Sequence, residues 1–204
     1  MTAAPPLTWL ALGDSYTIGE GLPLYHNYPY QAVQLLRNAG ITCYAPEIIA
    51  RTGWTTDELQ QAIDQTTLQP VYELVTLLIG VNNQYRGYPA DEYKVDFERL
   101  LQQGLALSGQ RPERVLVLSI PDWGATPFAE QQNRSATASA AIELFNQHNR
   151  SLARRYRTGY IDITPGSRLA ATHPSLLAPD LLHYSAVEYA RWARQLVHHI
   201  LAAI

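Results

Sequence analysis

Short apolar runs separated by mixed polar and apolar stretches form the main pattern along the chain. Five runs are short and apolar enough to be strands buried inside a parallel sheet. They cover residues 9–12, 41–49, 74–79, 114–120 and 160–163. Pro46 interrupts the second run, and proline cannot donate a hydrogen bond to a neighbouring strand. The pattern predicts five strands, with an irregular second one.

Between these runs, apolar residues recur at helical spacing. The predicted helices span residues 29–38, 55–65, 91–107 and 137–157, with a last helix after Ser185. Thr55 with Glu58, and Ser185 with Glu188, have the spacing of a capping box, in which the two side chains bond each other's backbone N–H groups. These pairs predict where two of the helices begin.

Strands that alternate with helices predict an α/β fold with a parallel sheet covered by helices on both faces. The crossovers between strands are expected to be right-handed. The chain has 204 residues, a natural length for one such domain, and contains no internal repeat or linker-like segment. We therefore expect a single domain over residues 1–204.

Composition narrows the possible partners. Hydrophobic residues make up 47% of the chain, which predicts a folded protein that is neither disordered nor membrane-spanning. The net charge is −3, so a nucleic-acid partner held by a basic face is not expected. The basic cluster Arg150, Arg154, Arg155 and Arg157 is interpreted as a solvated helix face. No apolar stretch is long enough to span a membrane, and no signal peptide is visible, so we expect a cytoplasmic protein.

Metal and disulfide chemistry are not expected either. Cys43 is the single cysteine, which excludes an internal disulfide and a cysteine-rich metal site. No cluster of histidine, aspartate and glutamate has metal-ligand spacing. Cys43 is interpreted as a small buried residue.

The tripeptide Gly13-Asp14-Ser15 directly follows the first apolar run. The carboxyl end of a parallel strand faces the crevice where open α/β sheets bind ligands, which makes Ser15 a candidate nucleophile. Gly, Asp and Ser are also common in ordinary turns. We expect Asp14 to fix this turn.

A second motif, Asp180-Leu181-Leu182-His183, lies near the end of the chain. An aspartate three residues before a histidine can accept a hydrogen bond from one ring nitrogen, which leaves the other free to take a proton from a serine hydroxyl. Serine needs such a base near neutral pH. By itself the spacing is more typical of an incidental loop histidine.

Two further motifs follow predicted strands. Asn82 lies in Gly80-Val81-Asn82-Asn83, and a side-chain amide there can donate to a developing oxyanion. Gly53, after the second run, lets the backbone approach a ligand and offer its own N–H. Each alone is also explained as a turn residue.

Together the four motifs resemble the SGNH (GDSL-type) hydrolase family in order and spacing along nearly the whole chain. The resemblance implies Ser15 as nucleophile, His183 as base and Asp180 as its orienting partner. It also implies an oxyanion hole formed by Gly53, Asn82 and the backbone N–H of Ser15. Its fold would be a flavodoxin-like three-layer α/β/α sandwich with a five-stranded parallel sheet of order 2-1-3-4-5. Tyr16, Asn83 and Tyr184 depart from the commonest motif residues, which leaves subfamily and substrate open.

Other residues compete for the same roles. His173 is a rival base, but Pro174 follows it and no carboxylate stands at a suitable spacing. Asp122 and Asp162 follow predicted strands, so either can be placed to orient a base; the short spacing favours Asp180.

Aromatic residues gather in the segments expected around the site: Tyr25, Tyr28, Trp54, Tyr85, Tyr88, Trp123 and Phe128. Such rings line acyl pockets, stack on sugars or simply pack. Trp54, Tyr85 and Trp123 are our candidate substrate-binding residues. We predict hydrolysis of small short-chain carboxylic esters without a cofactor, with a carbohydrate O-acetyl esterase as the alternative.

Functions of other classes have less support. Noncatalytic phosphate or nucleotide binding lacks both common glycine-rich phosphate motifs. The α/β-hydrolase route lacks its G-x-S-x-G elbow. A catalytically silent interaction module stays open, although intact Ser15, Asn82, Asp180 and His183 argue against it.

Overall fold

Five parallel strands form one sheet in the computed structural model, which describes residues 5–203. The strand order is β2-β1-β3-β4-β5, as expected from the family resemblance. The strands are β1 (Trp9–Asp14), β2 (Glu47–Arg51), β3 (Leu74–Leu78), β4 (Val115–Leu118) and β5 (Gly159–Ile161). All neighbouring pairs are parallel, so all five strands end at the same edge of the sheet.

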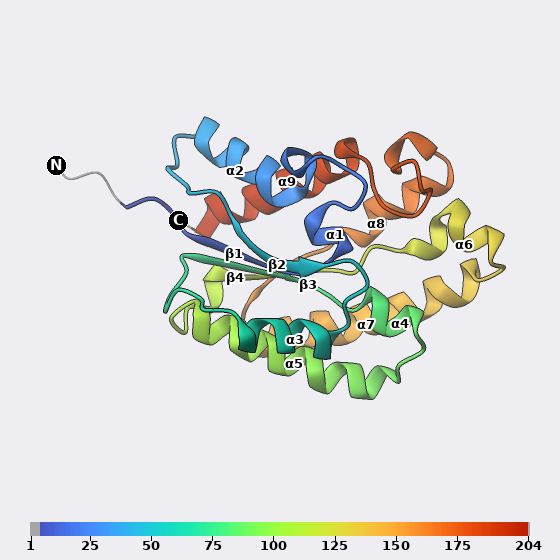
Figure 1. Cartoon of the computed structure of the whole chain (residues 1–204), viewed down its shortest axis with the longest axis horizontal. Coiled ribbons are helices and arrows are strands. Elements are labelled where there is room, and N and C mark those ends of the chain that lie inside the picture. The colour runs from blue at the N-terminus through green and yellow to red at the C-terminus, as the bar shows by residue number, and fades with distance from the viewer. Residues whose placement is uncertain (1–4, 204) are drawn as a thin grey trace.

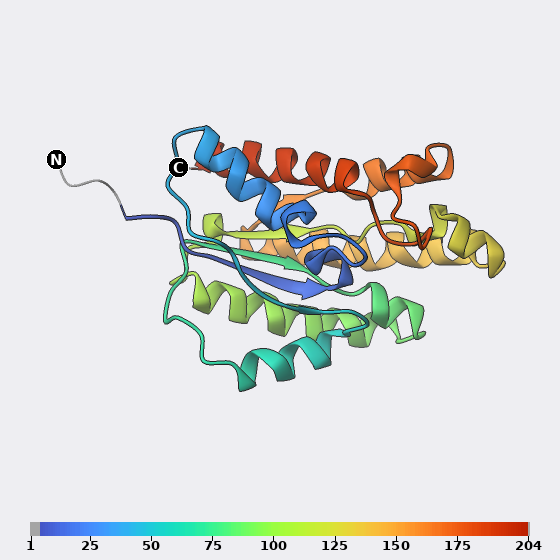
Figure 2. The same ribbon diagram turned by 45° about the horizontal axis from the view of Figure 1, so that its top comes forward.

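Helices cover both faces of this sheet (Figures 1 and 2). On one face lie α2 (Tyr28–Asn38) and α9 (Ala186–Ala203), packed against each other. On the other lie α3 (Thr56–Gln65), α5 (Ala90–Leu107) and α7 (Ser135–Tyr156). The expected three-layer α/β/α architecture is confirmed.

Short helices and 3-10 turns connect the larger elements, and several of them follow the carboxyl ends of strands. The short α-helices are α1 (Ser15–Ile18), α4 (Val81–Tyr85), α6 (Pro127–Gln131) and α8 (Thr164–Ser167). The 3-10 turns are η1 (Leu24–His26), η2 (Pro112–Arg114), η3 (Trp123–Ala125), η4 (Arg168–Ala171) and η5 (Pro174–Leu176). Of these, α1, α4 and η3 begin within a few residues of the carboxyl ends of β1, β3 and β4. The sequence pattern did not predict them, because a four- or five-residue helix has no measurable apolar period.

The central strands are buried along their whole length, because both faces carry helices. Every residue of β1, β3 and β4 is buried. The polar Thr76 in the middle of β3 accepts a hydrogen bond from Trp9 Nε1 at 3.0 Å, so neither of these two groups is buried without a partner.

The second strand begins later than the pattern predicted. It was expected over residues 41–49, but β2 starts at Glu47, after Pro46. Before the proline, Cys43 forms only an isolated bridge to Leu7. The missing N–H of proline breaks the ladder at this point, and pairing with β1 resumes beyond it.

Both helices begin where the sequence predicted, but only one of the two predicted capping boxes forms. Thr55 and Glu58 form the expected capping box at the start of α3. At the start of α9, Ser185 Oγ donates instead to the carbonyl of Ser175. The Glu188 carboxylate accepts from Trp192 Nε1 and pairs with Arg191. Ser185 is bonded to a residue ten positions earlier and Glu188 to the next turn of α9, so the predicted capping box does not form.

Within the described residues, no helix combines the length and the apolar character needed to cross a membrane.

Candidate active site

Ser15 is the first residue of α1, directly after β1, and its side chain is almost fully buried. Asp14 caps the helix by accepting a hydrogen bond from the N–H of Tyr16 at 3.0 Å, which is the turn-fixing role expected of it. Gly13 is required because a Cβ at this position would lie 2.1 Å from Thr17 Oγ1 and 2.4 Å from the carbonyl of Leu78. The first N–H groups of a helix have no intrahelical acceptor, so the Ser15 N–H points out of the helix start.

The Asp14 carboxyl group is buried beneath the serine. Its side chain is 1% exposed, and Oδ2 has no hydrogen-bond partner among the described residues. Burial raises the pKa of Asp14 from 3.8 to about 7, although the hydrogen bond from Tyr16 acts in the opposite direction. Near neutral pH this carboxyl is therefore partly protonated.

His183 reaches Ser15 from the far end of the chain. Its Nε2 lies 2.9 Å from Ser15 Oγ, and its Nδ1 lies 2.6 Å from Asp180 Oδ2. These distances allow the imidazole to take a proton from the hydroxyl while the carboxylate holds the ring.

The turn that carries His183 is held by Asp180 itself. Asp180 Oδ1 accepts hydrogen bonds from the N–H groups of Leu182 and His183 at 3.0 and 2.9 Å. Leu181 adopts a φ of +60°, in the left-handed region that non-glycine residues rarely use. Partial burial opposes ionisation of Asp180, but the hydrogen bonds from His183 and Leu182 outweigh it and lower its pKa.

Gly53 and Asn82 face the same cavity as Ser15. Gly53 has a φ of +86°, which glycine adopts readily, and its carbonyl accepts from Arg86 Nη2 at 2.6 Å. Asn82 Nδ2 donates to the carbonyl of Trp54 at 3.0 Å, which leaves its second amide hydrogen unused by that bond.

Asn83, the neighbouring asparagine, has a different position. It is fully buried, and its side chain bonds the backbone N–H and the hydroxyl of Thr56. It therefore ties α4 to α3, while Asn82 faces the cavity.

A cavity of about 210 Å³ opens beside Ser15 and His183. Its apolar wall is formed by side chains from four separate segments: Tyr16, Val81, Tyr85, Trp123, Phe128 and Leu182. Sequence reasoning missed Tyr16, Thr52, Val81 and Leu182 as lining residues. Each directly precedes or follows a predicted site residue, and this adjacency was the available signal.

Only part of the predicted aromatic group lines the cavity. Tyr85 and Trp123, two of the candidate substrate-binding residues, do so, as does Phe128. The third candidate, Trp54, is not a lining residue; its side chain is partly buried against the core.

The remaining aromatic residues lie elsewhere. Tyr28 is fully buried and its ring is 6.4 Å from that of Trp192, so it belongs to the core. Tyr25 is largely exposed. Neither Tyr25 nor Tyr88 is a lining residue.

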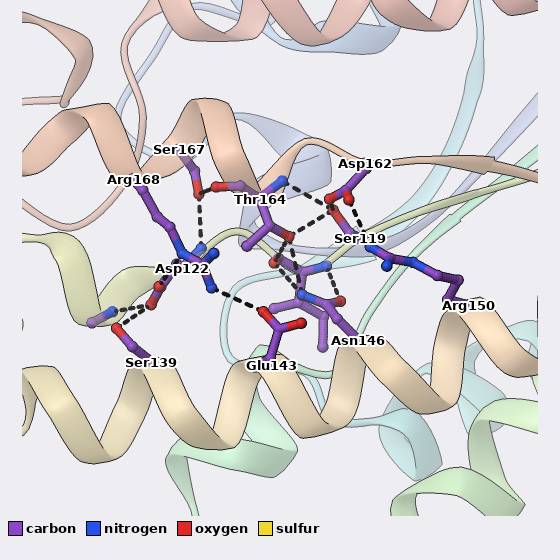
Figure 3. Close-up of polar contacts among 12 residues, drawn as sticks. Ser119, Asp122, Ser139, Glu143, Asn146, Arg150, Asp162, Thr164, Ser167 and Arg168 are labelled. Carbon is purple, nitrogen blue, oxygen red and sulfur yellow. Dashed lines mark hydrogen bonds and ion pairs between the residues drawn. The ribbon is translucent and has the colours of Figure 1, made fainter.

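The rival residues have other partners. His173 is exposed, with its Nδ1 2.9 Å from Thr172 Oγ1. Asp162 pairs with Arg150 at 2.6 Å. Asp122 is 1% exposed and binds Arg168 within a polar network (Figure 3).

That network fixes the turn η3. Asp122 Oδ1 accepts from the N–H of Gly124 and from Ser139 Oγ, and Oδ2 accepts from Arg168 Nε at 2.8 Å (Figure 3). The Asp122 N–H donates to Ser167 Oγ. Asp122 is therefore a structural residue that holds the backbone around Trp123.

Within residues 5–203, no group of three or more histidine, cysteine, aspartate or glutamate side chains is arranged to hold a metal ion.

Comparison with solved structures identifies proteins of the same fold. A lipase/acylhydrolase from Enterococcus faecalis superposes with a TM-score of 0.77 at 16% identity, covering 96% of each chain. The acetylxylan esterase Axe2 from Geobacillus stearothermophilus gives a TM-score of 0.74 at 16% identity, covering 95% of this chain and 94% of that one. A member of the lipolytic protein G-D-S-L family from Veillonella parvula gives 0.74 at 12% identity, covering 94% and 96%.

No curated protein sequence matches the chain significantly. The model of the GDSL-like Lipase/Acylhydrolase family, however, matches residues 11–191. This range contains all the residues that carried the resemblance. The chain thus belongs to the GDSL-like lipase/acylhydrolase family and is an esterase of the SGNH type.

Proposed function

We propose that this protein hydrolyses short-chain carboxylic esters through an acyl-enzyme formed on Ser15. One observation carries the proposal. Asp180, His183 and Ser15 form a continuous chain of contacts of 2.6 and 2.9 Å that ends in a cavity with an apolar wall. A buried serine without a base would be a poor nucleophile at neutral pH.

In the first step His183 Nε2 takes the proton of Ser15 Oγ as this oxygen attacks the ester carbonyl. The imidazolium that forms is stabilised at Nδ1 by the Asp180 carboxylate. The lowered pKa of Asp180 keeps this carboxylate ionised at neutral pH. The same hydrogen bond keeps the ring in the tautomer with a free Nε2.

Negative charge then develops on the carbonyl oxygen. The proposed donors are the N–H groups of Ser15 and Gly53 and the side-chain amide of Asn82. The bond from Asn82 to the carbonyl of Trp54 holds the amide in place before the substrate binds, so little reorganisation is needed.

His183 next protonates the leaving alcohol, and the acyl group stays on Ser15. A water molecule that gives its proton to His183 hydrolyses the acyl-enzyme and restores the serine.

The size of the cavity supports short acyl groups. A cavity of about 210 Å³ with an apolar wall accommodates an acetyl or butyryl group. We therefore expect turnover to be fastest with short acyl groups.

The test combines active-site labelling with turnover of acetyl, butyryl and octanoyl p-nitrophenyl esters. A fluorophosphonate should add once, on Ser15, as located by mass spectrometry. Butyryl ester should be hydrolysed faster than octanoyl ester. Ser15→Ala and His183→Ala should each remove nearly all turnover.

Ser151→Ala is the matched control, because Ser151 is an exposed serine on α7. It should keep full labelling and turnover. A folded protein with neither adduct nor turnover would favour the silent interaction module. An adduct on another serine would refute the assignment of Ser15.

A carbohydrate O-acetyl esterase is the second candidate. It is favoured by the shared fold with the acetylxylan esterase and by the cavity's capacity for an acetyl group. Acetate release from acetylated xylooligosaccharides, compared with p-nitrophenyl butyrate at matched enzyme concentration, distinguishes the two functions.

A further inference from the structure

Arg134 contacts two of the aromatic rings that line the cavity. Its guanidinium carbon lies 4.7 Å from the ring centre of Tyr85 and 4.9 Å from that of Trp123. The two rings meet edge to face, with centres 5.3 Å apart. Both rings line the cavity, whereas Arg134 does not. The arginine therefore acts on the cavity only through these rings.

Arg134 has no competing ionic partner. Within residues 5–203 it forms no ion pair, and its one side-chain hydrogen bond, at 3.2 Å, goes to the carbonyl of Tyr85. The planar guanidinium is therefore free to stack on aromatic faces, while its hydrogen bond to the carbonyl of Tyr85 keeps it beside that residue.

The backbone fixes where Arg134 lies. It directly precedes α7, its N–H donates to the carbonyl of Ala129 in α6, and its carbonyl accepts from Ala138. Both ribbon views place α4, α6 and the start of α7 beyond the carboxyl ends of the strands (Figures 1 and 2).

Trp123 is held firmly without the arginine. It is 1% exposed, and its Nε1 donates to Gln84 Oε1 at 2.6 Å. The network around Asp122 and Arg168 fixes its backbone (Figure 3).

Tyr85, in contrast, is much more exposed than Trp123. It is 40% exposed and ends the five-residue helix α4. Gly87, two residues later, has a φ of +78°. Among the described residues, only Trp123 and Arg134 stack on the Tyr85 ring.

We infer that Arg134 is a positioning residue that limits acyl-chain length by holding Tyr85 against Trp123 at the wall of the cavity. This inference rests on the proposed ester hydrolysis at Ser15. Without the guanidinium, Tyr85 can swing toward solvent and lengthen the cavity, so longer acyl groups gain access.

The experiment compares Arg134→Ala and Arg134→Met with the wild type on butyryl and octanoyl p-nitrophenyl esters. Methionine keeps an apolar stem of similar length and removes only the cation. In both variants the ratio of kcat/KM for octanoyl over butyryl ester should rise about fivefold, the change expected when one exposed cation–π contact is lost.

Arg155→Ala is the matched control. Arg155 lies near the end of α7 and stacks on a tyrosine, Tyr156, at 5.5 Å, but neither residue lines the cavity. Its loss should leave the ratio unchanged. An equal fall in kcat/KM for both esters in the Arg134 variants would mean a merely structural role and would overturn the inference.

A binding measurement separates this inference from the proposed function. In a Ser15→Ala background, calorimetry gives the dissociation constants of butyrate and octanoate, and their ratio cancels the charge that both anions share. Replacing Arg134 should lower the ratio of the dissociation constant of octanoate to that of butyrate about fivefold, whether or not the wild type hydrolyses esters. An unchanged ratio would overturn the length limit even if Ser15 proves to be the nucleophile.

Discussion

Replacing Asp14 by asparagine should make the stability of this protein less sensitive to pH. The carboxyl group is buried with Oδ2 unpartnered, and burial raises its pKa from 3.8 to about 7. Asparagine keeps the Oδ1 acceptor that caps the N–H of Tyr16 and has no charge to desolvate. The side chains are nearly equal in size, so little else changes.

The sign follows from proton binding. Between about pH 4 and pH 7 the folded protein retains a proton that the unfolded chain releases, so the free energy of unfolding falls as pH rises through this range. A pKa that rises from 3.8 to about 7 on folding corresponds to about 4 kcal/mol. Asp14→Asn removes this loss, and it should therefore stabilise the protein by up to about 4 kcal/mol at pH 8 and by almost nothing at pH 4.

Urea unfolding of both proteins at several pH values measures the effect. All other titrating groups are common to both proteins, so the difference between the two curves isolates Asp14. Asp91→Asn, which changes an exposed acid at the start of α5, should produce no comparable gain at high pH. The reasoning would be refuted if the difference in the free energy of unfolding between Asp14→Asn and the wild type stayed constant from pH 4 to pH 8. A constant difference would mean that Asp14 is ionised throughout this range in the folded protein.

Three further predictions test the site and its frame. Asn82→Ala should lower kcat on butyryl ester by about 10²- to 10³-fold with little change in KM, because it removes a proposed oxyanion donor; an unaltered kcat would exclude that role. Asp180→Asn should lower kcat by up to about 10⁴-fold in steady-state kinetics, because an amide cannot hold the same tautomer of His183. An unchanged kcat would show that Asp180 does not orient His183. Gly80→Ala should cost about 3 kcal/mol or more in urea unfolding, because Gly80 has a φ of +127° and a Cβ would lie 2.6 Å from Tyr93. Gly87→Ala, at a φ of +78° with open space around it, is its control and should cost only about 1 kcal/mol.

The sequence alone determined the features that depend on short-range interactions. Alternating apolar runs and amphipathic stretches predicted a parallel sheet between helices, because strands buried on both faces need apolar side chains on both faces. Thr55 and Glu58 predicted the start of α3, because a capping box is completed within four residues. The pair Asp180 and His183 was recognisable for the same reason, since one turn joins them. The strand order came from the family resemblance, because alternation fixes the layers but not the order of strands.

Only the tertiary structure decided what residues far apart in the chain do to one another. Ser15 and His183 are 168 residues apart, and their 2.9 Å contact depends on the strand order and on the packing of the segment before α9. Packing also brought Tyr85 and Trp123 to the cavity and kept Trp54 out of it. Ser185 and Glu188 matched a capping box, but Ser185 bonds the carbonyl of Ser175 and Glu188 bonds the next turn of α9 instead. A local pattern fixes which contacts a residue is able to make with its neighbours in sequence, whereas burial and long-range contacts depend on how all the layers pack together.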